Sequence, residues 1–143
     1  MQKKSKKKIV LDAWVILALL QKEEPAASRI KSILIDAQKG KYQIFISLIN
    51  LGEIYYNIGK RKGEKEAKET MDELLYLPIK VVKADKENIF NAATLKIYHS
   101  ISYADAFAAS LAQSINATLV TGDPELCQLS HIIKIEKLYR TPH

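Results

Sequence analysis

Short apolar runs alternate with segments of helical periodicity along the sequence, and this alternation limits the fold more than any other feature. Strand composition is found at residues 8–11, 42–47, 79–82, 117–121 and 132–135. Apolar residues recur at helical spacing after Asp12, over residues 26–38, 48–60, 64–76 and 86–98, after Ser102, and over residues 125–129. Strands that alternate with helices predict an α/β fold with a parallel sheet covered on both faces. Its crossovers are expected to be right-handed.

Residues that cap or break helices support these boundaries. Asp85 is expected to be the N-cap of the helix over residues 86–98. Pro25 closes the first helix, because the residue before a proline is disfavoured in the α conformation. Within residues 86–98, the positions expected to face inward are Ile89, Ala92, Ala93 and Ile97.

The chain is basic. It has 143 residues, the size of one ordinary domain, and its 22 Lys and Arg side chains against 16 Asp and Glu side chains give a net charge of +6. This balance favours a polyanionic partner, nucleic acid first and an anionic membrane second. A basic turn is expected between Gly59 and Gly63, and its side chains Lys60, Arg61 and Lys62 are candidate nucleic-acid contacts.

The N-terminal sequence and the cysteine content indicate a cytoplasmic protein without a membrane segment. Residues 1–8 are expected to be a lysine-rich arm that precedes a single domain over residues 9–143. The apolar run after the arm resembles part of a signal peptide, but Asp12 interrupts it and it is too short to span a bilayer. The single cysteine, Cys127, cannot form an internal disulfide, which fits a reducing compartment.

Acidic side chains stand at or near the start of several predicted helices. Asp12 and Asp123 each follow a strand, and Asp105 lies in the first turn of the helix that Ser102 caps. Glu53 lies one and a half turns into the helix that begins at residue 48. Ligands bind such sheets at the carboxyl ends of the strands, where the strand order reverses. We therefore expect these four acids to converge at that edge.

Converging carboxylates repel one another unless a cation intervenes. Mg²⁺ or Mn²⁺ suits a site made of oxygen ligands, whereas Zn²⁺ favours the His or Cys ligands that this set lacks. One metal ion, or two, can activate a water molecule and stabilise the charge that leaves a phosphodiester. Thr121, two residues before Asp123, has a hydroxyl that can orient a ligand or a metal-bound water. An acidic pocket in a basic protein therefore indicates cleavage of nucleic acid.

Each acid also has an ordinary structural explanation. Asp12 and Asp123 are good N-caps, Asp105 can complete its own cap, and a helical glutamate such as Glu53 is normally solvated. The coincidence of three of the four with strand ends or helix starts favours a shared site.

The residues that carry these acids resemble a known family. They are Ile9-Val10-Leu11-Asp12 with Ile16-Leu17-Ala18-Leu19-Leu20, Ser47-Leu48-Ile49-Asn50-Leu51-Gly52-Glu53-Ile54, Ile101-Ser102-Tyr103-Ala104-Asp105-Ala106, and Leu119-Val120-Thr121-Gly122-Asp123. In this order and over almost the whole chain after the lysine arm, they resemble the PIN domain, and the length and layout are those of the VapC-type toxin ribonucleases.

The resemblance implies a three-layer α/β/α sandwich that binds Mg²⁺ or Mn²⁺ and hydrolyses RNA. Asp12, Glu53, Asp105 and Asp123 fall on the family's catalytic, metal-binding acids, and Thr121 falls on its supporting hydroxyl position. A small antitoxin protein whose tail fills the acidic groove and a homodimeric state are implied in the same way.

The sequence departs from the family just after the first acid. Ala13 and Trp14 stand where the family usually has Ser or Thr and then a small polar residue. The loss of that hydroxyl is expected to reduce metal affinity or rate. A PIN domain that is weak or inactive, and that binds RNA or a protein without cutting, is therefore the alternative function.

Two other enzymatic readings have less support. An aspartate-based phosphatase needs a second Asp close behind the first, and Ala13 and Trp14 occupy those places. A nucleophilic pair of Cys127 and His131 lacks a third group that would orient it.

Overall fold

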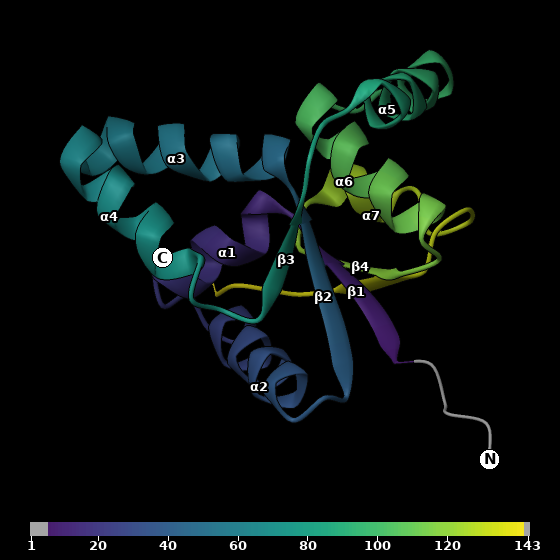
Figure 1. Cartoon of the computed structure of the whole chain (residues 1–143). Coiled ribbons are helices and arrows are strands. Elements are labelled where there is room, and N and C mark those ends of the chain that lie inside the picture. The colour runs from purple at the N-terminus through teal and green to yellow at the C-terminus, as the bar shows by residue number, and fades with distance from the viewer. Residues whose placement is uncertain (1–5, 142–143) are drawn as a thin grey trace.

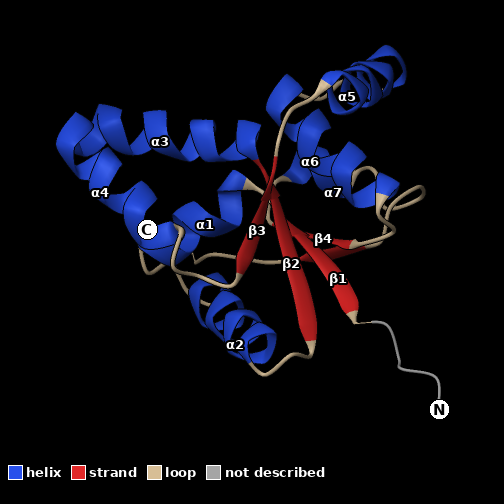
Figure 2. Ribbon diagram, viewed as in Figure 1, coloured by secondary structure: helices blue, strands red, loops and turns tan. Residues whose placement is uncertain are grey.

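The predicted strands pair side by side in one parallel sheet. In a computed structural model that describes residues 6–141, the strands are β1 (Lys7–Leu11), β2 (Tyr42–Ser47), β3 (Ile79–Val82), β4 (Thr118–Thr121) and β5 (Ile135–Lys137). The helices are α1 (Ala13–Leu20), α2 (Ala26–Gln38), α3 (Leu48–Lys62), α4 (Glu64–Leu74), α5 (Lys86–Tyr98), α6 (Tyr103–Ser114) and α7 (Pro124–Cys127). The predicted α/β fold, a three-layer sandwich around a parallel sheet, is confirmed (Figures 1 and 2).

The strand order reverses at the centre of the sheet. The order is β3-β2-β1-β4-β5, so the chain builds outward from β1 on one side and then crosses to its other side at β4. Leu11, the last residue of β1, pairs with Val120 of β4. Asp12, which directly follows β1, therefore lies beside Thr121, the last residue of β4. This is the crevice where α/β sheets bind ligands.

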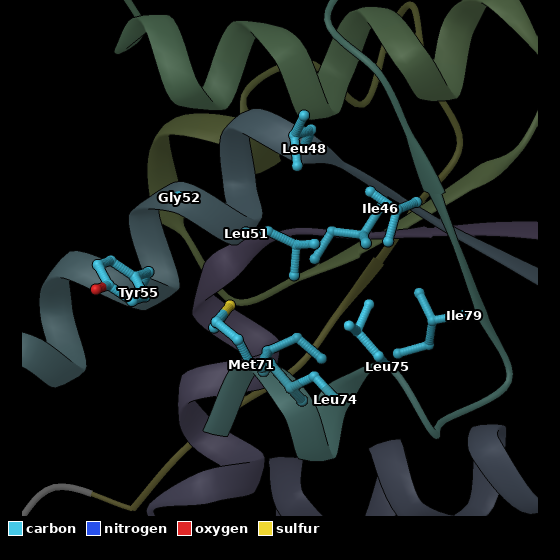
Figure 3. A pocket seen from close by; sticks show the side chains of 11 residues that line it. Ile46, Leu48, Leu51, Gly52, Tyr55, Met71, Leu74, Leu75 and Ile79 are labelled. Carbon is cyan, nitrogen blue, oxygen red and sulfur yellow. The ribbon is translucent and has the colours of Figure 1, made fainter. Parts of the chain in front are cut away.

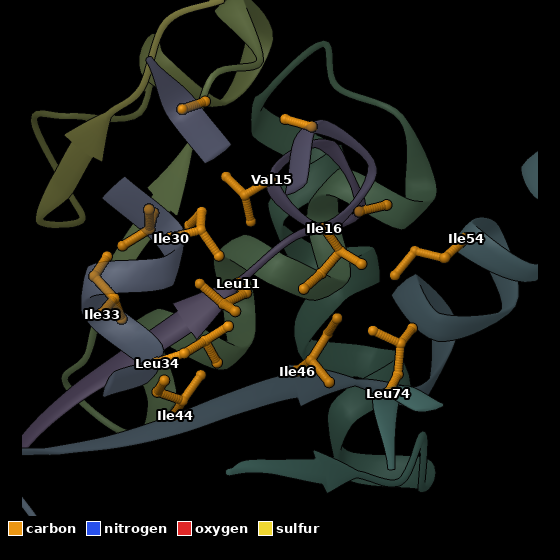
Figure 4. Close-up of a cluster of buried hydrophobic side chains, with 14 of the residues drawn as sticks. Leu11, Val15, Ile16, Ile30, Ile33, Leu34, Ile44, Ile46, Ile54 and Leu74 are labelled. Carbon is orange, nitrogen blue, oxygen red and sulfur yellow. The ribbon is translucent and has the colours of Figure 1, made fainter. Parts of the chain in front are cut away.

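Alternation along β1 divides the interior into two cores. Ile9 and Leu11 point into a first core, which is closed by α1, α2, α3 and α4 (Figure 4). Val10, between them, belongs to a second core under α5, α6 and α7. A strand buried on both faces reads as a continuous apolar run, which is why β1 is easily recognised in the sequence.

Helix α6 is buried on almost every side, and its small residues allow this. Ala106, Ala108, Ala109 and Ala112 have exposures of 0%. With no bulky side chain in the way, the helix packs closely between the sheet and α5. Asp105 is carried into this environment and keeps only 7% of its surface exposed.

The structure corrects several boundaries. The basic turn expected from residue 59 is instead the last turn of α3, and the chain breaks only at Gly63, where φ is 97° and a side chain would be strained. The last strand was expected at residues 132–135 and lies at Ile135–Lys137. Strand β1 starts at Lys7, inside the expected arm, and residues 1–5 of that arm lie outside the described residues.

The inward face of α5 is also different from the expected one. Ala92 is buried as predicted, but Ile89 is 37% exposed and Ile97 is 73% exposed, so their assignment to the interior was wrong. Leu95 fills the inner position instead, at 8% exposure. The helix packs mainly on the alanine-rich surface of α6, which accommodates only a narrow apolar stripe.

Within residues 6–141, no helix combines the length and the apolar character that a membrane crossing requires.

Candidate active site

Asp12 is a buried carboxylate at the end of the central strand. It is 2% exposed and caps α1, where its Oδ1 accepts a hydrogen bond from the backbone N–H of Val15 at 3.1 Å. Its Oδ2 accepts a hydrogen bond from the hydroxyl of Thr121. The N-cap explanation is therefore correct, and the same side chain also faces the other acids. One residue fixes the ends of β1 and β4 together.

The loop after β4 is organised around Thr121. Besides donating to Asp12, its Oγ1 accepts a hydrogen bond from the backbone N–H of Asp123 at 3.0 Å. Asp123 then caps α7, because its Oδ1 accepts from the N–H of Glu125 at 2.9 Å. The hydroxyl thus aligns the two acids on either side of it, while its predicted supporting role at the active site stays a prediction.

Three carboxylates come within reach of one ion. Single carboxylate oxygens of Asp105, Asp123 and Glu125 all lie within 4.8 Å of one another. Asp105 reaches this point from the first turn of α6, where its N–H donates to the Ser102 hydroxyl at 3.1 Å. Glu125 is a residue that the sequence analysis missed. The available signal was its place two residues after Asp123, in the first turn of α7.

Glu53 is tied to the same region through Asn50. The side-chain nitrogen of Asn50 donates to Glu53 Oε1 at 3.4 Å and to the backbone carbonyl of Ala104, the residue before Asp105, at 3.1 Å. Asn50 therefore links α3 to the start of α6. Glu53 is half-buried, so the solvated glutamate of the ordinary explanation does not describe it.

The raised pKa values of these acids show that their ionised forms are unfavourable in the folded protein. Burial raises the pKa of Asp12 to about 7, against the lowering effect of its hydrogen bonds from Thr121 and Val15. Burial, and then the charge of Asp123, raises the pKa of Asp105 to about 8. Burial and the charge of Asp123 also raise the pKa of Glu53. Asp12 in turn responds to both Asp123 and Glu53, so the four predicted acids form one electrostatic group.

The donor set fits a hard divalent cation. The cluster offers carboxylate oxygens, which Mg²⁺ and Mn²⁺ prefer. The Oδ1 atom of Asn50 provides an independent indication, since Asn50 is 0% exposed and this oxygen has no hydrogen-bond partner in residues 6–141. A buried acceptor without a donor is costly. Water held by a partly hydrated cation is a donor that can satisfy it.

Trp14 explains how the site accommodates its unusual residues after Asp12. Its ring lies against Gly122, where a Cβ atom would overlap it. The guanidinium of Arg140 covers the ring with its Cζ 5.4 Å from the centroid. Trp14 thus packs under the loop that carries Thr121 and Asp123. Ala13 lacks the hydroxyl that the family usually has after the first acid. Asp12 instead accepts a hydrogen bond from the hydroxyl of Thr121.

The remaining candidates lie outside this cluster. Lys60, Arg61 and Lys62 form the last turn of α3, with Lys60 over the Tyr56 ring at 5.6 Å and Lys62 paired to Glu66 at 3.6 Å.

The alternative nucleophilic pair of Cys127 and His131 gains no support from the structure. Burial raises the pKa of the Cys127 thiol, which disfavours the thiolate. The ring of His131 packs edge-on against His99 at 6.0 Å, and its Nδ1 lies 3.1 Å from the Gln128 carbonyl oxygen.

Comparisons with known proteins agree with this architecture. The sequence matches the family model of the PIN domain over residues 9–132. No curated protein matches it. The structure is similar to VapBC2 from Rickettsia felis bound to a DNA fragment from its promoter, with 20% identity, a TM-score of 0.68 and coverage of 91% of this chain and 98% of that chain.

Two further solved structures are similar over nearly their whole length. DNA-bound VapBC from Salmonella typhimurium is 18% identical, with a TM-score of 0.70 and coverage of 92% of this chain and 98% of that chain. VapC20 from Mycobacterium tuberculosis, a toxin that cleaves the sarcin–ricin loop, is 16% identical, with a TM-score of 0.70 and coverage of 93% and 99%. At these identities the similarity concerns the fold.

Without divalent ions, the protein is expected to lose stability as the pH rises from about 4 to about 8. The pKa of Asp12 rises from 3.8 to about 7 on folding, so the folded state holds a proton that the unfolded state has already released. For Asp12 this corresponds to about 4 kcal/mol. Urea unfolding at a series of pH values measures the slope. The slope of the unfolding free energy against pH should become shallower in Asp12→Asn and on addition of Mn²⁺. A stability that rises over the same pH range contradicts the prediction.

Asn50→Ala is expected to weaken Mn²⁺ binding about 10–100-fold, the usual cost of losing a group that orients a ligand. Calorimetric titration with Mn²⁺ alone measures this. Asn57→Ala is the matched control, because Asn57 bonds the backbone carbonyl of Glu53 at 2.9 Å and not its carboxylate. Equal affinities of the two variants would remove Asn50 from the metal site.

Proposed function

Because this chain belongs to the PIN domain family, we propose that it is a divalent-metal-dependent endoribonuclease and the toxin of a VapBC-type toxin–antitoxin pair. The observation that carries the proposal is that carboxylate oxygens of Asp105, Asp123 and Glu125 lie within 4.8 Å of one another, and that Asp12 and Glu53 are close enough to respond to the charge of Asp123. A protein of net charge +6 with such an acidic centre is suited to an anionic backbone that is to be cut.

The residues have distinct roles in this proposal. Asp105, Asp123 and Glu125 would hold the cation, and Glu53, whose carboxylate accepts a hydrogen bond from Asn50, would face the same centre. Asp12 is held by Val15 and Thr121 with both oxygens fixed, so it presents its free lone pairs in one orientation. The cation, Mg²⁺ or Mn²⁺, supplies an activated water and neutralises charge on the phosphodiester.

Metal-dependent cleavage is tested by incubating the pure protein with a mixed RNA pool, with and without Mn²⁺, and mapping the new ends. Cleavage at defined sites with Mn²⁺ is expected, together with its loss on chelation. Asp105→Asn should reduce cleavage to the level seen without metal, since it removes a charge from the cation site. Asp72→Asn, an exposed change on α4, should cleave as the native chain does.

The result also decides between the two functions. If RNA is bound but no cut appears with either Mg²⁺ or Mn²⁺, the chain is the non-cutting PIN domain of the alternative. If Asp105→Asn cleaves normally, this acid does not belong to the active site.

An apolar groove is a suitable docking surface for the proposed antitoxin. A groove of about 430 Å³ runs between α3, α4 and the edge of the sheet, and its walls are almost entirely apolar (Figure 3). Leu48 and Leu75 on its rim are 50% and 66% exposed. Such surface normally marks an interaction site. The occupant we propose is an apolar segment of a small antitoxin, because several similar structures are VapBC complexes.

Leu75→Glu is expected to weaken the complex at least about tenfold, because it places a charge in an apolar interface. The probe is the purified product of a small open reading frame adjacent to the gene of this chain, where one is present, titrated by calorimetry. Tyr76→Glu, at a neighbouring position that is 89% exposed and does not line the groove, is the control. Equal binding of both variants places the antitoxin elsewhere. The homodimer and the cytoplasmic location remain predictions.

A further inference from the structure

A second charged surface lies at the opposite end of the sheet from the acids. There, a pocket of about 420 Å³ is lined by Ile115 and by six polar residues, Lys6, Lys7, Lys8, Asn116, Thr118 and Lys134. We call these six polar residues the basic pocket. It is formed where β1 and β4 begin, whereas the acids stand where these strands end. No acidic residue lines it.

The backbone around the basic pocket is held in place. Thr118 lies beside Ile9 in the β1–β4 ladder. The carbonyl of Lys134 accepts a hydrogen bond from the N–H of Leu119 at 2.9 Å. Asn116 takes a left-handed conformation, with φ 54°, in the tight turn that leads from α6 into β4. Three separate stretches of the chain therefore bring their polar side chains to one pocket by main-chain structure.

The charge of the basic pocket is not neutralised by the protein. In the described part of the chain, none of its four lysines takes part in an ion pair. Hydrogen bonds from Arg29, at 2.8 Å and 2.9 Å, are the main cause of the lowered pKa of Glu136, and the charge of Lys7 adds to it. Both carboxylate oxygens of Glu136 are thus already paired with Arg29. Lysines gathered at one pocket repel one another, and an anion bound among them removes that cost.

We propose that the basic pocket binds the phosphate backbone of RNA and gives the substrate a second point of attachment, remote from the acidic centre. The inference rests on the proposed ribonuclease function. Lysine acts as a point charge toward phosphate, and neutral side chains such as those of Asn116 and Thr118 commonly donate to phosphate oxygens as well. RNA is favoured over a membrane surface because the same chain carries the phosphodiester-cutting site.

The spacing of the two sites sets a length requirement. Lys8 and Asp12 are four residues apart along β1, about 13 Å at the rise of a parallel strand. With the lysine side chains added, the two sites are about 20 Å apart in a straight line, so an RNA must run over the surface for more than this distance to contact both. A shorter RNA can occupy one site at a time.

The test compares two triple variants in the Asp105→Asn background, where RNA stays intact. One carries Lys6→Gln, Lys8→Gln and Lys134→Gln. The control carries Lys31→Gln, Lys65→Gln and Lys86→Gln, which removes the same charge from exposed positions elsewhere. Fluorescence anisotropy with a 20-nucleotide and a 4-nucleotide RNA, over a series of salt concentrations, gives the affinity and its salt dependence.

For the 20-nucleotide RNA, the basic-pocket variant should lose at least about tenfold in affinity at low salt. The slope of log K against log salt should fall by about 2, because three single-strand phosphate contacts are removed. The control should change much less. Equal losses in the two triple variants overturn the proposal, as does a native affinity that is no higher for the 20-nucleotide RNA than for the 4-nucleotide RNA.

A parallel measurement with phosphatidylserine vesicles separates the two polyanions. If the basic-pocket variant loses vesicle binding while RNA binding is unchanged, the pocket serves a membrane and the proposal is wrong. Failure of the ribonuclease function has a different signature. It appears as absent cleavage in the native chain, while the affinities measured on the uncleaved RNA still decide whether the basic pocket binds it.

Discussion

Repulsion between buried carboxylates is the constraint on which the functional end of the molecule depends. The pKa values of Asp12 and Asp105, near 7 and 8, show that the folded chain favours proton retention when no cation is bound. Thr121 and the N–H of Val15 act in the opposite direction by stabilising the ionised form of Asp12. The protein therefore holds its acids in position without fully stabilising their negative charges. A bound cation would supply the missing stabilisation.

Most of the fold is predictable from the sequence because its local signals agree with one another. β2 and β3, together with α2 and α5, have the predicted bounds, since apolar periodicity and flanking breakers coincide there. The failures occur where the signals compete. Gly59 does not break α3, because a glycine in a helix costs about 1 kcal/mol, which packing against α4 offsets. Ile89 and Ile97 are apolar at helical spacing, yet burial on α5 follows the narrow surface that α6 offers.

The site was predictable to the extent that it follows strand ends. Asp12 and Asp123 are placed by topology alone, and Asp105 by its capping motif. Glu53 was included among the converging acids without a strand end or a cap to place it, because a position within a helix does not reveal which neighbour it faces. Glu125 offered only its place two residues after Asp123, and Asn50 offered no signal. Their importance comes from contacts between α7, α3 and α6, and apolar periodicity does not record which helices meet.

The two ends of the sheet differ in charge for a reason that lies in chain direction. In a parallel sheet every strand begins at one edge and ends at the other, so residues placed before β1 and β4 cannot mix with those placed after them. This chain has lysines at the first kind of position and acids at the second. Each set is thereby kept from neutralising the other within the molecule. A cation is left to bind at one edge and an anion at the other, and an RNA backbone with its metal ions can supply both.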